Sequence, residues 1–206
     1  QALEIPVVNY YPDVSFMAHG PLIPQALPLY DHVFTTKSYG IADMKKRLGI
    51  TRSSFLEPGF DPEIHRPVTL TDEEQKTYGC DAVFIGTWSP KKEKLLTSLI
   101  NNRPETDLKI WGCQWEKSQS EELVVCAMGD EVTGDEYTKA LLGGKICLGL
   151  LSEKRVGASS GDLITARTFQ IPACKAFMLH ERNEEVLRYF AEDNDAAFFD
   201  SPEELT

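Results

Sequence analysis

The chain has 206 residues, and its 32 acidic and 21 basic side chains give a net charge of −11. Hydrophobic residues make up 42% and charged residues 26%, which is typical of a globular protein and excludes a disordered or fibrous one. The acidic balance argues against nucleic-acid binding, because a groove for phosphates needs clustered Lys and Arg. No apolar run approaches the ~20 residues that span a bilayer, so we expect no transmembrane segment.

The cysteines and histidines predict a protein without disulfides, metal or cofactor. The five cysteines are odd in number and widely spaced, without a CxxC pair, which is typical of a reduced, cytoplasmic protein. The four histidines show no metal-ligand spacing. The N-terminal sequence QALEIPVV lacks a basic stretch, a long apolar stretch and a Met, which indicates a processed or excised chain.

The first third of the chain predicts part of an α/β layer. IPVVNYY is expected to form a strand, and a Pro-rich connection leads from it to a second strand at 32–36. A helix is expected at 38–48. A short strand and a stretch interrupted by Pro and Gly follow at 53–67, and we place a domain boundary after residue 68.

From residue 69 onward, strands alternate with helices, which is the pattern of a parallel sheet covered by helices. Pro172 fits only the first turn of a helix, so the helix within TARTFQIPAC is expected to begin no earlier than about Thr168. The run Ser201-Pro202-Glu203-Glu204 predicts one more helix start. The fold class is therefore α/β. The other strands are expected at 81–86, 108–111, 145–151, 176–179 and 196–199, and the other helices at 91–101, 134–142 and 183–191.

Polar groups follow the first of these strands, at the edge where open α/β sheets bind ligands. Gly86 and Thr87 close the strand, and Lys91 and Lys92 open the next helix. A glycine, a hydroxyl and two cations in this order suit a diphosphate. The alternative interpretation is a plain turn with two solvated lysines.

Two later strand ends carry further candidates. Trp111 and Gly112 follow a strand, where an indole ring could form a wall for a base or a sugar, although an ordinary packed tryptophan is the alternative. Arg167 precedes the predicted helix start and could clamp a phosphate with two hydrogen bonds, or it could instead satisfy nearby carbonyl groups.

Several known motifs are excluded by their context. Asp193-Asn194-Asp195 has the D-x-D pattern of metal-dependent glycosyltransferases, but it lies between a helix end and a strand start and is interpreted as a turn. Gly143-Gly144-Lys145 lacks the other residues of a P-loop and is interpreted as a helix stop. The absence of GxSxG and GxGxxG excludes a serine hydrolase and a Rossmann dehydrogenase.

Several segments of the chain occur together in one known family. They are, in chain order, YDHVFTTKSYG, LEPGFDPEIHRP, DAVFIGTWSPKKEKLLTSL, LKIWGCQW, VTGDEYTKALLGGKICLGLL, TARTFQIPACKAFMLHERNEEV and FFDSPEEL. Through them the chain resembles the CgeB-like (spore maturation protein) glycosyltransferases, which are grouped with family 1 and have the two-domain GT-B architecture. The resemblance implies that residues 1–68 are the end of the acceptor-side N-terminal domain plus the linker. It implies that residues 69–206 are the donor-binding C-terminal domain, truncated at its end.

The resemblance implies transfer of a sugar from a nucleotide-diphosphate donor to an unknown acceptor, without a metal. Many relatives carry a Glu at the position of Gln170, where it grips the ribose hydroxyls. Asp13 and His19 follow the first strand and are the candidates for the general base or acceptor clamp, with a capping Asp and a loop His as the alternative. The donor-binding residues would be Gly86, Thr87, Lys91, Lys92, Trp111, Gly112, Val132, Thr133, Tyr137, Thr165, Arg167, Thr168 and Gln170.

Two other functions remain open at this stage. A non-catalytic module that binds a nucleotide or nucleotide-sugar is favoured by the truncation and by Gln170. A plain interaction domain could also have kept the α/β scaffold after losing its chemistry. Binding of nucleotide-sugars separates the third interpretation from the first two, and hydrolysis of the donor separates the enzyme from the binding module.

Overall fold

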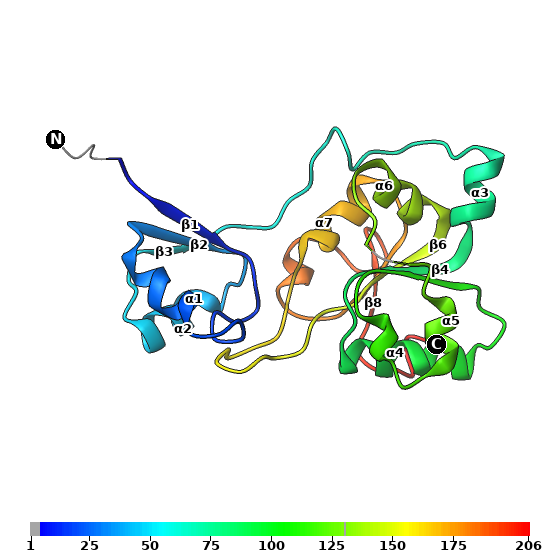
Figure 1. Cartoon of the computed structure of the whole chain (residues 1–206). Helices are drawn as coiled ribbons and strands as arrows, with labels where there is room; N and C mark the ends of the chain where they lie inside the picture. Colours follow the sequence, from blue (N-terminus) through cyan, green and yellow to red (C-terminus); the bar gives the residue numbers. More distant parts are fainter. Residues whose placement is uncertain (1–4, 130) are drawn as a thin grey trace. The chain divides into compact units, whose positions relative to one another are not determined.

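The computed structural model describes residues 5–129 and 131–206, which form two compact units (Figure 1). The first unit comprises Gln1–Pro58 and Ser152–Thr165, and the second comprises Gly59–Leu151 and Ala166–Thr206. Every strand pairing among the described residues is parallel. This confirms the α/β class with Rossmann-like parallel sheets.

The first unit is a small three-stranded layer. Its sheet has the order β1-β2-β3, and Phe16, Val33 and Met44 are central to its core. The elements are β1 (Val8–Tyr11), α1 (Leu22–Ala26), η1 (Leu27–Leu29), β2 (His32–Thr35), α2 (Gly40–Leu48) and β3 (Ser53–Phe55).

The second unit is a five-stranded sheet with helices on both faces. The strand order is β5-β4-β6-β7-β8. Helices α4 and α5 cover one face, and α3, α6 and α7 cover the other (Figure 1). The strands are β4 (Cys80–Ile85), β5 (Leu108–Trp111), β6 (Gly144–Gly149), β7 (Met178–Glu181) and β8 (Ala197–Phe199), and the helices are α3 (Asp72–Tyr78), α4 (Pro90–Asn102), α5 (Glu121–Cys126), α6 (Gly134–Gly143) and α7 (Ala166–Ala173).

The core of the second unit lies between the sheet and the α4–α5 face. Phe84 from β4 and Ile110 from β5 pack with Leu96 of α4 and Leu123 of α5, and all four are fully buried. Strands covered on both faces are expected to be continuous apolar runs. This explains why DAVFIG and LKIW could be predicted as strands from the sequence.

Three predicted helices differ from the structure. Helix α7 begins at Ala166, before the predicted limit at Thr168, and Pro172 lies inside it. This is tolerated because the helix ends one residue later, so the missing N–H affects only the last turn. In place of the helix predicted at 183–191 there is only η3 (Val186–Arg188), where the amides of Arg188 and Tyr189 bond three residues back.

The predicted helix start at Ser201 is a single turn. Its hydroxyl accepts the Glu204 N–H at 3.3 Å, as an N-cap does, and the Leu205 N–H bonds to the Ser201 carbonyl. The prediction of the cap therefore holds locally, whereas no helix is present in the described residues that follow.

The limits of the two units differ from the predicted domain boundary. The first unit ends at Pro58 rather than at residue 68, and it includes Ser152–Thr165, which lies between β6 and α7 in the chain. Two buried carboxylates hold this segment inside the first unit. Asp43 accepts the amide and the hydroxyl of Ser159 at 2.7 and 3.0 Å, and Lys37 pairs with Asp162 at 2.5 Å. Local sequence patterns carry no signal for such long-range contacts.

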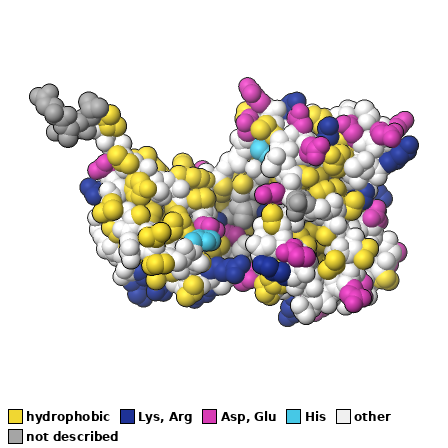
Figure 2. Space-filling view, in the orientation of Figure 1, with side chains coloured by type: hydrophobic (Ala, Val, Ile, Leu, Met, Phe, Trp, Pro, Cys, Tyr) yellow, Lys and Arg dark blue, Asp and Glu magenta, His cyan; other side chains and the backbone are white. Residues whose placement is uncertain are grey.

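The surface of the second unit carries charges of both signs. Figure 2 shows acidic and basic side chains interspersed on the visible face of the second unit. Within residues 5–129 and 131–206, no helix is long and apolar enough to cross a membrane.

Candidate functional site

The strand order β5-β4-β6 creates a topological switch point in the second unit. The chain leaves β4 to form β5 on one side and later forms β6 on the other side of β4. In open α/β sheets, ligands bind outside the carboxyl ends of the strands at such a point. Gly86 directly follows β4, and Leu150 directly follows β6. These two residues therefore mark where a ligand site is expected.

Arg167 reaches this switch point from the first turn of α7. Its Nη2 donates to the carbonyl oxygen of Leu150 at 2.9 Å, and its guanidinium carbon lies 5.3 Å from the centre of the Phe84 ring. A Cβ on Gly86 would come within 2.8 Å of Arg167 Nη1. Gly86 is thus the small residue that leaves space for the guanidinium group.

The turns after β4 and β5 pack closely against each other at two glycines, Gly86 and Gly112. Gly112 has φ +137°, and a Cβ there would lie 2.3 Å from the carbonyl oxygen of Gly86. The same oxygen accepts the indole N–H of buried Trp115 at 2.9 Å. The backbone of Gly86 is therefore held firmly beneath Arg167.

Lys91 is part of an ion pair at the same edge. Its ammonium lies 2.5 Å from Glu181 Oε2, and the amide of Leu151 donates to Glu181 Oε1 at 2.5 Å. Glu181 ends β7, so its side chain links the ends of β6 and β7 to the start of α4. The structure thus brings Lys91, Arg167 and Gly86 together around the switch point.

Lys92 has a different environment from Lys91. Only 4% of it is exposed, and its ammonium donates to the carbonyl oxygen of Thr87 at 3.0 Å. It lies 5.9 Å from the Phe84 ring. Lys92 therefore stabilises the turn that carries Thr87. Thr87 itself is exposed to solvent.

Tyr137 and Gln170 connect helices α6 and α7. The Tyr137 hydroxyl donates to Gln170 Oε1 at 2.7 Å, and the edge of the tyrosine ring meets His65 at 5.5 Å between ring centres. Burial raises the pKa of Tyr137, so its hydroxyl stays protonated and acts as the donor. The amide oxygen of Gln170 is engaged by this bond.

Thr168 and His180 form a fully buried pair under the start of α7. Thr168 Oγ1 lies 3.0 Å from His180 Nε2, and His180 Nδ1 lies 2.7 Å from the carbonyl oxygen of Glu181. A neutral ring that donates from Nδ1 and accepts at Nε2 satisfies both contacts. Burial lowers the pKa of His180 from 6.5 to about 4, so the ring is neutral near pH 7.

This histidine should make stability depend on pH. Between pH 6.5 and about 4 the unfolded chain binds a proton that the native chain does not, so the free energy of unfolding should fall on acidification. The full effect is about 3 kcal/mol. Denaturant titrations at several pH values should show a smaller loss of unfolding free energy on acidification for His180→Gln than for the wild type, because glutamine cannot titrate. Equal slopes in this window for the wild type and the variant would contradict the assignment.

The structure places other predicted donor-site residues in the core, directly before α6 or in the first unit. Trp111 is 5% exposed and packs on Tyr78 at 5.9 Å between ring centres, which is the ordinary packed tryptophan of the alternative interpretation. Val132 and Thr133 precede α6, and Thr133 is exposed. Thr165 is the last residue of the segment that packs within the first unit.

Asp13 and His19 form a pair within the first unit. His19 Nε2 lies 2.7 Å from Asp13 Oδ2, and about half of each side chain is exposed, 53% and 55%. Of the two ring nitrogens of His19, Nε2 is the one that contacts the carboxylate.

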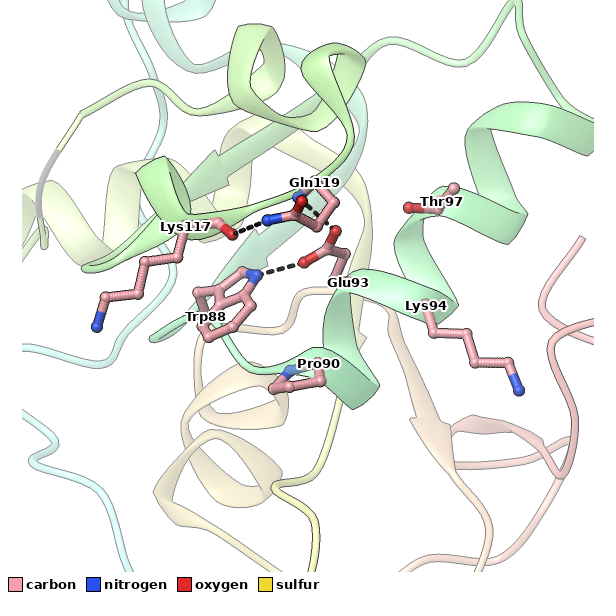
Figure 3. Close-up of a pocket in the computed structure, with 7 residues that line it drawn as sticks. All are labelled: Trp88, Pro90, Glu93, Lys94, Thr97, Lys117 and Gln119. Carbon is pink, nitrogen blue, oxygen red and sulfur yellow. Dashed lines mark hydrogen bonds between the residues drawn. The ribbon is translucent and has the colours of Figure 1, made fainter.

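A pocket of about 480 Å³ lies on the outer side of the turn after β4 (Figure 3). The Glu93 carboxylate accepts the Trp88 indole N–H at 2.6 Å and the backbone N–H of Gln119 at 2.7 Å. The ammonium groups of Lys94 and Lys117 extend away from this network (Figure 3). The network fixes Trp88, in the turn between Gly86 and α4, to Glu93 of α4.

The D-x-D run forms a turn, as predicted. Asp193 has φ +61°, and Asp195 Oδ2 accepts the amide of Ala191 at 2.8 Å. Among the described residues, no group of three or more His, Cys, Asp or Glu side chains could hold a metal ion.

Glu181 and His180 are the site residues that the sequence analysis missed. The strand was predicted to end at residue 179, whereas β7 ends at Glu181. The available signal was a carboxylate two residues after the predicted end of a buried strand.

A family model described as glycosyl transferase-like matches residues 91–206, which is more than half of the chain. The chain belongs to this glycosyl transferase-like family. The matched residues include all of β6, α7 and β7 and all of α4 except its first residue, and therefore Lys91, Arg167 and Glu181. No curated protein matches the sequence significantly.

Solved glycosyltransferase structures share the fold of this glycosyl transferase-like chain. They are HepE from Anabaena, in complex with UDP and glucose (11% identity, TM-score 0.64), sucrose-phosphate synthase from Thermosynechococcus elongatus (11%, 0.59) and AviGT4, a glycosyltransferase involved in avilamycin A biosynthesis (15%, 0.56). The matches cover 97%, 96% and 99% of this chain but only 60%, 56% and 64% of those structures. The predicted GT-B fold is confirmed.

Proposed function

We propose that this chain is the donor-binding part of a glycosyltransferase. The enzyme would move a sugar from a nucleotide-diphosphate-sugar donor to an acceptor without a metal. The observation that carries the proposal is the meeting of Lys91, Arg167 and the Gly86 turn at the switch point of the sheet. Departure of the diphosphate builds up negative charge, which fixed cations stabilise.

The comparisons support a uridine nucleotide as the first donor to test. HepE was crystallised with UDP and glucose, and its fold is shared by this chain. A hexosyl donor, a CgeB-like specificity and a cytoplasmic location are parts of the same proposal. The cytoplasmic location is supported by the five cysteines, none of which is in a disulfide within the described part of the chain.

The two units have separate roles in this proposal. The second unit carries the donor site, and the first unit carries the acceptor side. His19, held by Asp13, would act there as the base for the acceptor hydroxyl. Thr87, Gly112, Val132, Thr133, Tyr137 and Thr165 remain proposed as the surroundings of the donor, whereas Trp111 and Thr168 are buried.

Thermal unfolding with a panel of UDP, GDP, CDP and dTDP sugars tests the proposal. A ligand at a hundredfold excess over its Kd stabilises the native state by about 2.7 kcal/mol, so a micromolar binder should shift the melting temperature clearly. We expect a shift with one nucleotide of the panel and a smaller shift with the free sugar. The absence of any shift across the panel would favour a plain interaction domain.

A non-catalytic nucleotide-sugar-binding module is the second candidate. It is favoured by Gln170, whose amide oxygen is already bonded to Tyr137 and which cannot accept ribose hydroxyls as strongly as a carboxylate. Release of free sugar from the bound donor separates the two functions. The enzyme should hydrolyse its donor slowly without an acceptor, whereas the module should bind the donor and leave it intact.

A further inference from the structure

One peptide group at the switch point binds a cation through its carbonyl oxygen and an anion through its N–H. The carbonyl oxygen of Leu150 accepts from Arg167 at 2.9 Å, and the N–H of Leu151, in the same peptide group, donates to Glu181 at 2.5 Å. The other carboxylate oxygen of Glu181 lies 2.5 Å from the ammonium of Lys91. The Glu181 carboxylate thus contacts one cation, Lys91, and one backbone amide, and Arg167 binds the other side of the same peptide group.

The groups gathered at this strand end are those that bind phosphate in other proteins. An ammonium, a backbone N–H at a strand end and a nearby guanidinium are common donors to phosphate oxygens. Each oxygen of Glu181 faces one of these donors. The side chain is 15% exposed and Lys91 is 36% exposed, so an anion from solvent can reach the pair.

We propose that Glu181 is an internal counter-ion that occupies the phosphate-binding donors of this edge in the empty protein and competes with the incoming diphosphate. This rests on the proposed function, because it assumes that the donor diphosphate binds beside Lys91. The carboxylate lowers the positive charge of the site and thereby limits affinity for any phosphate that arrives. Displacement of Glu181 frees the Lys91 ammonium and the Leu151 amide together.

A purely structural ion pair would behave differently from a competing counter-ion. Loss of a structural partner would lower stability and leave nucleotide binding unchanged or weaker. Loss of a competing carboxylate strengthens the attraction between the remaining cations and a phosphate. The sign of the change in affinity therefore separates the two roles.

The test compares Glu181→Gln with the wild type by calorimetric titration with UDP and with inorganic pyrophosphate. Glutamine keeps an acceptor for the Leu151 amide but removes the charge. We expect a Kd about tenfold lower for both probes, with the gain shrinking as salt is added. The matched control is Asp81→Asn, which removes the same charge from the Lys145 pair at the amino end of β4 and should leave both Kd values unchanged. An unchanged or higher Kd in Glu181→Gln would overturn the proposal.

A second variant ties the effect to Lys91. In a Lys91→Gln background, the further change Glu181→Gln should improve the Kd by less than about threefold, because the freed ammonium is absent. If Glu181→Gln improves the Kd as much in the Lys91→Gln background as in the wild type, the proposed competition for Lys91 is overturned. Tighter binding of pyrophosphate without binding of any nucleotide would support the counter-ion and contradict the proposed function. Binding of neither probe by the wild type or by Glu181→Gln would overturn both.

Discussion

The Arg167→Met variant should bind a nucleoside diphosphate about 10- to 100-fold more weakly than the wild type. The loss of a charge-assisted, two-point contact to phosphate accounts for a change of this size. Methionine keeps an apolar side chain on the Phe84 ring, where the guanidinium now lies, so the packing changes less than in an alanine variant. Titration calorimetry with UDP, or with whichever nucleotide the panel selects, measures the change.

A control variant separates phosphate binding from support of the backbone. Arg103 also donates to a backbone carbonyl, that of Thr206 at 2.8 Å, but it directly follows α4 and lies away from the switch point. Arg103→Met should leave the nucleotide affinity unchanged. If Arg167→Met folds normally by circular dichroism and binds with wild-type affinity, Arg167 has no contact with the ligand.

The Gly112→Ala variant should lose about 4 kcal/mol of unfolding free energy. Its backbone at φ +137° is strained for any residue with a side chain, and the new Cβ would lie 2.3 Å from the Gly86 carbonyl oxygen. That oxygen also accepts the Trp115 indole N–H, so it cannot move freely. Denaturant unfolding followed by tryptophan fluorescence measures the loss.

Gly129→Ala is the matched control for this prediction. Gly129 has φ +131°, and a Cβ there would meet nothing within 4 Å. It should therefore lose only the backbone strain of about 1–3 kcal/mol, and the difference between the two variants is the cost of the contact with Gly86. Equal losses in both variants would mean that the turns after β4 and β5 can separate without cost.

The strands could be predicted because their pattern is local. Leu108–Trp111 was predicted with the observed limits, since a strand buried on both faces is a short apolar run between polar segments. Helix α3 was missed although Thr71 and Glu74 form a capping box, a signal that the sequence contains. The helix predicted at 183–191 failed because its polar and apolar residues also fit a short 3₁₀ turn, and local propensity does not separate the two.

The candidate site was only partly predictable for a related reason. Gly86, Lys91 and Arg167 could be assigned to one edge of the sheet because parallel strands align their carboxyl ends. Their partners could not be assigned, because Glu181 and the Leu150–Leu151 peptide group come from strands far away in the chain. The burial of Trp111 against Tyr78 was likewise open, since either face of the sheet could have received it.

The sequence by itself determined the α/β class, the positions of most strands and the polar residues that follow them. These features depend on hydrophobic periodicity and turn chemistry over a few residues. The tertiary structure decided that Ser152–Thr165 packs in the first unit and that Glu181 lies between Lys91 and Leu151. Such pairings depend on which strands become neighbours, and the energy that selects them arises only when distant segments are buried together.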